Sequence, residues 1–427
     1  MTGRAQIIQS MPHLPIATVL TRRSAIAVFL VFAFAYFLST LIRAITATLA
    51  PTLTEEFALN AGDLGLLAGG YFLGFSATQI PLGRWLDQRG PKRVILYFLA
   101  VAVLGCLAFS YSTSFSGLLA ARILCGVGVS ACLMAPLTGY RRWFDVAILM
   151  RANSWMLMTG SLGMVASTLP VQWLLPVVSW RMLFVGLAAL VVVAMALIAW
   201  QVPGWDDSTG PTAESAQSAA TYADVWKHPY FHAMAPMGFF CYGGLVAVQT
   251  LWAAPWLVKV AHYDALQAAK GLFWINVAML CTFWVWGMIN PWLARRGFHA
   301  DRLITYGLPS SFVLLAIIIG AESRLSTNAG AVWAFYCMSC SFVSLAQPAV
   351  GMAFAPRLAG RALSAYNLVL FAGVFVVQWG LGLAIDAFKA LGLHEIQAYQ
   401  SAMSILLLCC IASYVYFLVI KSHNQTI

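Results

Sequence analysis

Long apolar runs separated by short polar loops dominate this sequence. A helix needs about 20 apolar residues to cross the hydrocarbon of a bilayer. Continuous runs of this length exclude a closed β-barrel, whose strands are short and alternate in polarity. The pattern therefore predicts an all-α integral membrane protein with twelve transmembrane helices. The predicted spans are 25–50, 62–83, 93–112, 115–139, 152–176, 181–202, 231–258, 268–292, 302–321, 328–355, 362–387 and 396–420.

A six-residue phrase occurs twice, and it divides the chain into halves. Trp85-Leu86-Asp87-Gln88-Arg89-Gly90 returns 207 residues later as Trp292-Leu293-Ala294-Arg295-Arg296-Gly297, with four of the six positions identical. Repeats of this length in membrane proteins are typical of duplicated bundles that bind a solute at the repeat interface. We predict two pseudo-symmetric six-helix bundles joined by a cytoplasmic linker. The expected segments are an N-terminal segment at 1–24, bundles at 25–202 and 231–420, the linker at 203–230, and a tail at 421–427.

Composition supports lipid as the solvent of this chain. Of the 427 residues, 61% are hydrophobic and only 9% are charged, with a mean hydropathy of +0.82, whereas a soluble protein carries roughly 25% charged residues. A net charge of +10 can indicate nucleic-acid binding, but here the charges lie in short loops between apolar runs, which argues against it. All nine cysteines fall inside predicted spans, so no disulfide framework is expected.

The distribution of basic residues predicts the orientation. With both termini inside, seventeen Lys and Arg residues fall in inner segments and five in outer segments, and the remaining two, Arg43 and Arg122, lie within spans. This bias predicts cytoplasmic N and C termini in a bacterial inner membrane. The first apolar run has the length of a full span and no small-residue cleavage site, so we expect a retained helix.

Three motifs resemble those of the major facilitator superfamily. Residues 83–93, Gly-Arg-Trp-Leu-Asp-Gln-Arg-Gly-Pro-Lys-Arg, are similar to its signature loop between helices 2 and 3. Arg122 with Gly126 and Gly128 is similar to its helix 4 motif, and Trp180-Arg181 is also typical of the family. The resemblance covers nearly the whole chain and implies alternating access. It also implies a cytoplasmic gate built from these residues: Gly83, Asp87, Arg89, Gly90, Arg93, Arg141 and Arg361.

Asp87 is the acidic member of this gate. A carboxylate at the end of helix 2 can pair with guanidinium groups such as those of Arg141 and Arg361. In the family such contacts link the halves when the cytoplasmic side is shut. The alternative is that these loop charges only determine topology. Because Ala294 replaces the acid in the second copy, we expect an asymmetric gate.

Two arginines are the only full charges expected at membrane depth. None of the fourteen acids lies in the middle of a span, although Asp386 approaches this position near the outer end of its span. A buried arginine costs roughly 2.5 kcal/mol or more, so it should face a watery cavity or a partner. The region around Arg43 is similar in layout to the organophosphate/phosphate antiporter branch, which implies that Arg43 binds an anionic substrate group. The position related to it by the repeat is Thr250, and this neutral partner favours a monoanion or zwitterion over a doubly charged ester.

Alternatives remain open for both arginines. Arg43 can instead snorkel outward or pair with backbone carbonyls. Arg122 is a second candidate substrate ligand, but its motif favours a structural or coupling role. The other candidate substrate-binding residues share polar or aromatic character within a span, and each can instead join helices to one another. They are Tyr36, Tyr71, Gln79, Gln249, Trp252, Asn276 and Asn367.

The predicted function is secondary transport of a small organic anion or zwitterion: a carboxylate, amino acid, peptide or sugar acid. The expected partners are this substrate, the lipid bilayer, and a proton or a counter-anion for coupling. We expect a monomer with no cofactor, no bound metal and no enzymatic activity. Three alternatives use the same scaffold: a soft-metal (copper) transporter, a drug transporter and a non-transporting membrane sensor.

Overall fold

The computed structural model describes residues 20–205, 222–321, 325 and 328–424. Most of the predicted N-terminal segment, most of the predicted linker and the end of the predicted tail lie outside these ranges. Within them, the chain is helical and contains no strand. The all-α prediction is therefore confirmed for the described part of the chain.

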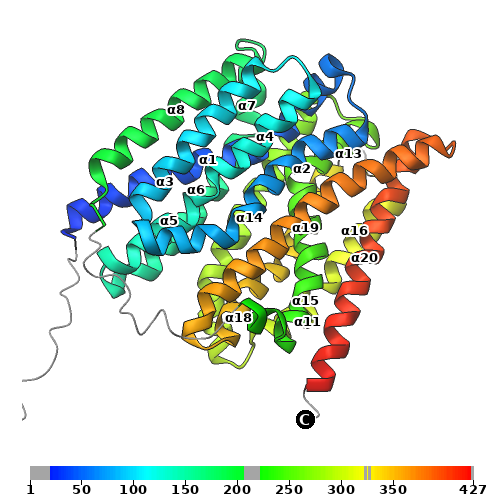
Figure 1. Cartoon of the computed structure of the whole chain (residues 1–427). Helices are drawn as coiled ribbons and strands as arrows, with labels where there is room; N and C mark the ends of the chain where they lie inside the picture. The colour runs from blue at the N-terminus through cyan, green and yellow to red at the C-terminus, as the bar shows by residue number, and fades with distance from the viewer. Residues whose placement is uncertain (1–19, 206–221, 322–324, 326–327, 425–427) are drawn as a thin grey trace, which may run out of the picture.

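The first half of the chain forms one group of helices (Figure 1). Thr21, Ser114 and Ser179 cap three of these helices through side-chain oxygens that accept a backbone N–H. The helices are α1 (Arg22–Phe57), α2 (Ala61–Ala77), α3 (Gln79–Tyr111), α4 (Phe115–Val129), α5 (Ala131–Trp143), α6 (Val146–Ala166), α7 (Leu169–Leu174) and α8 (Trp180–Gln201).

The second half forms a second group, in which one long element contains two π-helical turns. This element is made of α11 (Pro229–Met237), η2 (Gly238–Tyr242, π), α12 (Gly243–Ala247), η3 (Val248–Trp252, π) and α13 (Ala253–Lys259). The others are α10 (Tyr222–Trp226), α14 (Ala265–Arg295), α15 (Ala300–Gly307), α16 (Pro309–Ala321), α17 (Ala329–Cys340), η5 (Ser341–Leu345, 3-10), α18 (Ala346–Ala353), α19 (Pro356–Ala390) and α20 (Glu395–Asn424).

Each of the twelve predicted spans overlaps in sequence with at least one observed helix. Ten helical stretches of the described residues are long and apolar enough to cross a membrane. Neither α2, with 17 residues, nor α6 is among the ten. The helix α3 contains a corner at Gly90, so that residues 79–89 and 91–111 are two helices in sequence. The membrane-spanning character is confirmed, while the count of twelve spans stays a prediction.

Both copies of the repeated phrase end in a glycine with a positive φ. Gly90 has φ +75° and Gly297 has φ +81°. A side chain is disfavoured at such positive angles, whereas glycine adopts them freely. The repeat therefore encodes a tight corner at the same point of each half.

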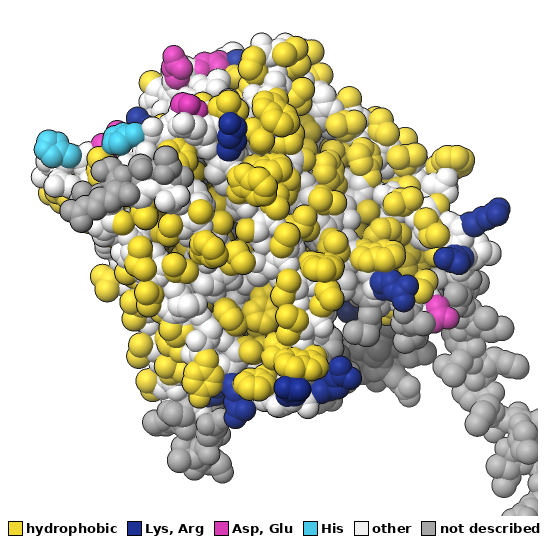
Figure 2. All heavy atoms as spheres, turned by 180° about the vertical axis from the view of Figure 1, so that it is seen from behind, with side chains coloured by type: hydrophobic (Ala, Val, Ile, Leu, Met, Phe, Trp, Pro, Cys, Tyr) yellow, Lys and Arg dark blue, Asp and Glu magenta, His cyan; other side chains and the backbone are white. Residues whose placement is uncertain are grey.

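Each half has its own apolar core. One cluster of buried residues lies mainly in 25–202 and the other mainly in 225–417. The halves meet most extensively where α2 runs beside α19 (Figure 1). Large apolar side chains also cover the outside of the molecule, as Figure 2 shows, and Leu104 and Trp274 are each 62% exposed. Such a surface is suited to lipid.

The two ends of the molecule are distinct. At one, the linker end, the Leu20 amide donates to Trp143 O at 3.0 Å and Lys92 Nζ donates to Val202 O at 2.7 Å. The C-terminal part of α20 lies there too, with Lys421 Nζ 3.1 Å from Thr305 Oγ1. The opposite end, where Asp386 on α19 accepts from the Gly62 amide at the start of α2, is called the Asp386 end. On the face shown in Figure 2, most Lys and Arg side chains lie at one rim and most Asp and Glu side chains at the other.

Candidate functional site

The guanidinium of Arg43 lies at the junction of the two halves. It is 5.6 Å from the ring centre of Phe75 on α2 and 5.8 Å from that of Phe371 on α19. These two rings, one from each half, are 4.4 Å apart. Arg43 therefore sits behind an aromatic pair that bridges the bundles, and it does not extend outward to the lipid surface.

Tyrosine side chains from both halves surround this cation. Tyr36 on α1, Tyr71 on α2 and Tyr242 on η2 lie close enough to interact electrostatically with Arg43. Tyr36 and Tyr71 are buried, whereas Arg43 and Tyr242 are only part-buried. The cation is thus lined by hydroxyl groups and keeps some accessible surface.

The guanidinium of Arg43 shares a hydrogen bond with Tyr71 but keeps one buried donor unpaired among the described residues. Its Nε is buried and has no hydrogen-bond partner among the described residues. A guanidinium carries five donors in a planar fork that matches a carboxylate or another oxyanion. With aromatic faces on one side and hydroxyl donors around it, the site is suited chemically to holding one small anionic group.

Arg122 occupies a different position. It is fully buried on α4, its Nη1 donates to Ile42 O at 2.9 Å, and its Nη2 donates to Arg43 O at 3.4 Å. Its guanidinium lies 5.2 Å from the ring centre of Tyr71. Arg122 therefore contacts the backbone that carries Arg43 and the ring of Tyr71, a tyrosine of the site.

Several of the predicted polar residues form a network inside the second half. Gln249 donates to Asn276 Oδ1 at 2.8 Å. Gln378 donates to Thr250 Oγ1 at 2.8 Å, and Trp252 Nε1 donates to Gln378 O at 3.1 Å. All five side chains are buried, and their mutual bonds link η3 to α14 and α19.

Two other predicted residues are also engaged locally. Asn367 accepts from Gln347 Nε2 at 2.6 Å, which joins α19 to α18. Gln79 donates to Phe75 O at 3.1 Å, across the break between α2 and α3. The structure thus groups Tyr36, Tyr71 and Arg43, and places the other polar candidates in separate contacts.

The predicted gate residues lie at the linker end. A Cβ at Gly83 would be 3.6 Å from Ser364 Oγ, so the halves approach each other there. Asp87 is exposed, and the positive charge of Arg141 acts on it. No salt bridge joins Asp87 to Arg141 or Arg361 within the described ranges. Arg361 lies near Tyr222, on α10.

The corner of the signature loop packs against the beginning of the linker. A Cβ added at Gly90 would be 2.3 Å from the Trp205 side chain. Arg142 covers the same indole at 4.5 Å. Arg89 and Arg93 are exposed beside it, and Arg89 lines a shallow surface hollow of about 270 Å³ together with Trp85 and Tyr97.

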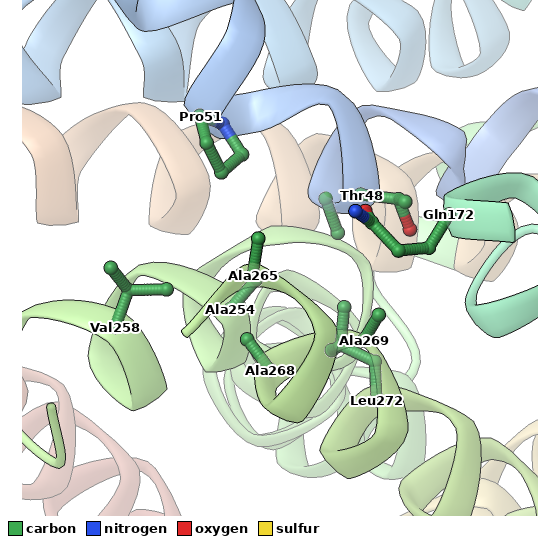
Figure 3. A pocket seen from close by; sticks show the side chains of 10 residues that line it. Thr48, Pro51, Gln172, Ala254, Val258, Ala265, Ala268, Ala269 and Leu272 are labelled. Atoms are coloured by element: carbon green, nitrogen blue, oxygen red, sulfur yellow. The ribbon is translucent and has the colours of Figure 1, made fainter. Parts of the chain in front are cut away.

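At the Asp386 end the halves are closely packed. A gap of about 20 Å³ remains between Thr48, Pro51 and Gln172 on one side and the small residues of α13 and α14 on the other (Figure 3). This volume admits about one water molecule. The gap is therefore a seam between the halves and is too small for an organic substrate.

Sequence reasoning missed three residues of the Arg43 site. Phe75 and Phe371 look like ordinary apolar span residues, and only the pairing of α2 with α19 brings them together. Tyr242 had a usable signal, because it lies one residue before the position that the 207-residue repeat relates to Tyr36.

The chain matches the family model described as Major Facilitator Superfamily over residues 32–378. It is 25% identical over 248 residues to the probable sulfoacetate transporter of Cupriavidus necator, covering 55% of this chain and 57% of that protein. It is 29% identical over 150 residues to the hexuronate transporter of Escherichia coli K12, covering 35% of each chain. The aligned parts thus span little more than half of these relatives, or less.

A solved structure shares the architecture. A bacterial homolog of the human lysosomal transporter Spinster, in an inward-facing and unoccupied conformation, superposes with a TM-score of 0.73 at 16% identity, covering 95% of this chain and 99% of that one. At this identity, the likeness concerns the fold alone.

Proposed function

Because the chain belongs to the major facilitator superfamily, we propose that it is a secondary transporter of small organic anions that works by alternating access. The observation that carries this proposal is Arg43: a part-buried guanidinium at the junction of the halves, with a buried Nε that has no partner among the described residues. The names of two relatives, transporters of sulfoacetate and of hexuronate, support the anionic class.

The local charge favours a substrate whose bound end carries one negative charge. Arg43 is one cation, and Arg122 is already bonded to two backbone carbonyls. Thr250, at the repeat-related position, is neutral and bonded within its own half. A carboxylate, a sulfonate or the anionic end of a zwitterion fits this arrangement better than a phosphate ester with two charges.

Twelve spans with both termini in the cytoplasm complete the proposal. Residues 79–89 extend α2 beyond its 17 residues, and α6 with α7 supplies the fifth span. The gathering of basic side chains at one rim supports a cytoplasmic linker end. We place the chain in a bacterial inner membrane as a monomer, with the bundles and linker at the predicted boundaries.

The two ends of the molecule differ in how closely the halves contact each other, and we infer the gating mechanism from this difference. The Asp386 end is packed down to a gap of about 20 Å³, while Asp87 at the linker end has no salt bridge to Arg141 or Arg361 in the described residues. Asp87, Arg141 and Arg361, with Gly83, Arg89, Gly90 and Arg93 around them, would come together when the linker end closes. Coupling would use a counter-anion or the proton carried by the substrate, because no acid lies at mid-span.

The alternatives have less support. No group of three or more His, Cys, Asp or Glu side chains that could hold a metal ion is present in the described ranges, so nothing there favours metal transport. A drug carrier would not need the donor-rich site around Arg43. The proposed transporter needs no cofactor and performs no chemical reaction.

Uptake into proteoliposomes tests the proposal, with labelled sulfoacetate and glucuronate as probes. The protein should accumulate at least one of them, and Arg43→Gln should abolish this uptake, while Arg43→Lys retains charge but loses the planar fork. Arg296→Gln is the control, because Arg296 is exposed over its neighbour Trp292 at 4.1 Å. Uptake that is equal in wild type and Arg43→Gln would refute the anion site.

A further inference from the structure

The two π turns of the α11–α13 element differ in how their side chains are used. Regular helices rarely contain π turns, and those that occur are frequent at functional sites. In η3, Gln249, Thr250 and Trp252 are all hydrogen-bonded within the second half. In η2, Tyr242 has no hydrogen-bond partner among the described residues and keeps exposed surface. The first π turn therefore leaves a donor unused.

Thiol groups from neighbouring helices support this first turn. Cys340 Sγ, on α17, donates to Cys241 O at 3.5 Å, and Cys410 Sγ, on α20, donates to Phe240 O at 3.6 Å. Both carbonyls belong to η2. A π turn departs from the regular i→i−4 pattern, so additional donors to its carbonyls offset part of the cost. Thiols are weak donors, but they are small enough to fit in a tightly packed core.

The same turn is fixed from the side of α19. A Cβ at Gly373 would lie 2.3 Å from Phe239 O, and one at Gly243 would lie 2.8 Å from the Gly373 carbonyl carbon. The backbone of η2 therefore rests directly on the backbone of α19. Close contact of this kind leaves the turn little freedom to rotate.

The consequence is the position of the Tyr242 side chain. Its ring meets Phe371 edge-on at 6.3 Å, and Arg43 lies 5.8 Å from the same phenylalanine ring. Tyr242 and Arg43 also interact electrostatically. They belong to different halves, and both are part-buried, whereas Phe371, which each of them contacts, is buried.

We infer that Tyr242, aimed by the thiol-supported π turn η2, is the second half's ligand for the anionic group held by Arg43, and that Cys410 is a positioning residue for it. The inference rests on the proposed function. An oxyanion between the halves would accept from the guanidinium of one half and from the Tyr242 hydroxyl of the other. Substrate binding would then draw the halves together at this level.

Transport kinetics with sulfoacetate and glucuronate test the hydroxyl. Tyr242→Phe keeps the ring against Phe371 and should raise KM about tenfold to a hundredfold, since it removes a hydrogen bond to a charged group. Tyr399→Phe is the matched control, because this buried tyrosine of α20 packs on Trp252 at 6.3 Å, outside the site. An unchanged KM in Tyr242→Phe would overturn the inference and leave the proposed function standing.

The positioning role of Cys410 has its own readout. Cys410→Ala removes the donor to Phe240 O and should raise KM about two- to threefold, with kcat little changed, because the thiol is only a weak donor. Cys410→Ser restores a donor and should restore KM. Cys410→Ala should add nothing in the Tyr242→Phe background, because the thiol acts through the tyrosine. Additive effects would refute this role.

A second experiment requires no substrate. The Tyr242→Cys protein in detergent is treated with the anionic reagent 2-sulfonatoethyl methanethiosulfonate or the cationic reagent 2-trimethylammonioethyl methanethiosulfonate. Peptide mass spectrometry quantifies the modification of residue 242 separately from that of the exposed Cys281. The anionic reagent should react several-fold faster than the cationic one, and Arg43→Gln should abolish this preference. Equal rates would overturn the shared site. A preference without uptake of either probe would instead contradict the proposed function.

Discussion

The carboxylate of Asp386 on α19 accepts a hydrogen bond from the backbone amide of Gly62 at the start of α2, at 2.6 Å. The other oxygen accepts from the Ala61 amide at 3.2 Å. Asn60 caps the next amide, that of Asp63, at 2.6 Å. The N-terminus of α2 is thus completed by an acid from the opposite half, where the helix dipole favours negative charge. This contact has to break whenever the Asp386 end opens.

We expect Asp386→Asn to shift the molecule toward opening at this end. The variant loses the charge in bonds that contribute about 1.5–3 kcal/mol, so the closed population should fall roughly tenfold or more relative to the open one. Spin labels at Glu55→Cys and Leu391→Cys, in a Cys281→Ser background, report the opening as longer distances; both sites are exposed.

The control for this variant is Asp63→Asn. Asp63 lies in the same first turn and accepts from the Asn60 amide, so its contact stays within α2. It should leave the label distances unchanged. Distance distributions that are identical for Asp386→Asn and the unsubstituted protein would exclude a latch at Asp386.

The close approach of α2 and α19 predicts a large effect of added methyl groups. A Cβ at Gly382 would lie 2.2 Å from Ala61 O, and one at Gly65 would lie 2.5 Å from Gln378 O. Each alanine substitution should force these helices apart at a cost of about 1–3 kcal/mol and lengthen the same label distances. Gly380→Ala is the control, since nothing lies within 4 Å of its Cβ position. Equal effects of Gly380→Ala and Gly382→Ala would mean that helix propensity, and not contact between the halves, decides the outcome.

The fold could be predicted from the sequence because lipid leaves few solutions. An apolar run of about 20 residues has to be helical to satisfy its backbone, and the two copies of the repeated phrase marked the middle of the chain. The π turns that interrupt the α11–α13 element were harder to predict. The π turn η2 rests on α19 and receives thiol donors from α17 and α20, and the side chains of η3 bond to α14 and α19. None of these elements is a neighbour in sequence.

The site was predictable only in part, and for a related reason. Arg43 stood out because a charge at membrane depth is rare. A neutral polar side chain can line a cavity or join two helices, depending on how its helix is rotated about its own axis. The predicted spans give the position of each helix in the sequence but not this rotation. Gln249 and Asn276 show this, because they bond to each other. Tyr242 is aimed at Arg43 by a π turn that no sequence periodicity indicated.

Arg122 should affect stability more than substrate affinity. Arg122→Gln removes two bonds to the carbonyls of α1 and leaves space around Tyr71, so we expect a loss of about 1.5–3 kcal/mol and a lower melting temperature. In the folded fraction of Arg122→Gln, KM should change by no more than about twofold. Arg43→Gln should instead abolish uptake and lower the melting temperature less than Arg122→Gln does. The reverse pattern, with intact melting and lost affinity in Arg122→Gln, would place Arg122 among the substrate ligands.

The two glycines of the repeated phrase separate backbone strain from side-chain contact at the linker end. Gly90 and Gly297 have φ of +75° and +81°, so alanine should cost about 1–3 kcal/mol of conformational strain at each position. Only Gly90 is covered by a side chain, that of Trp205, 2.3 Å from the Cβ position, whereas nothing lies within 4 Å of the Cβ position at Gly297. We therefore expect Gly90→Ala to lower the melting temperature more than Gly297→Ala does.

Removing the indole tests the source of this difference. In a Trp205→Ala background, the clash disappears, and the cost of Gly90→Ala should fall to that of backbone strain alone. Trp205→Ala alone should also weaken the attachment of the first linker residues, because it removes the ring that Arg142 covers at 4.5 Å and that Trp143 meets at 6.3 Å. Faster proteolysis between residues 203 and 230 than in the unsubstituted protein would report this loosening. If Gly90→Ala costs as much without Trp205 as with it, the strain lies in the corner itself and the linker does not rest on it.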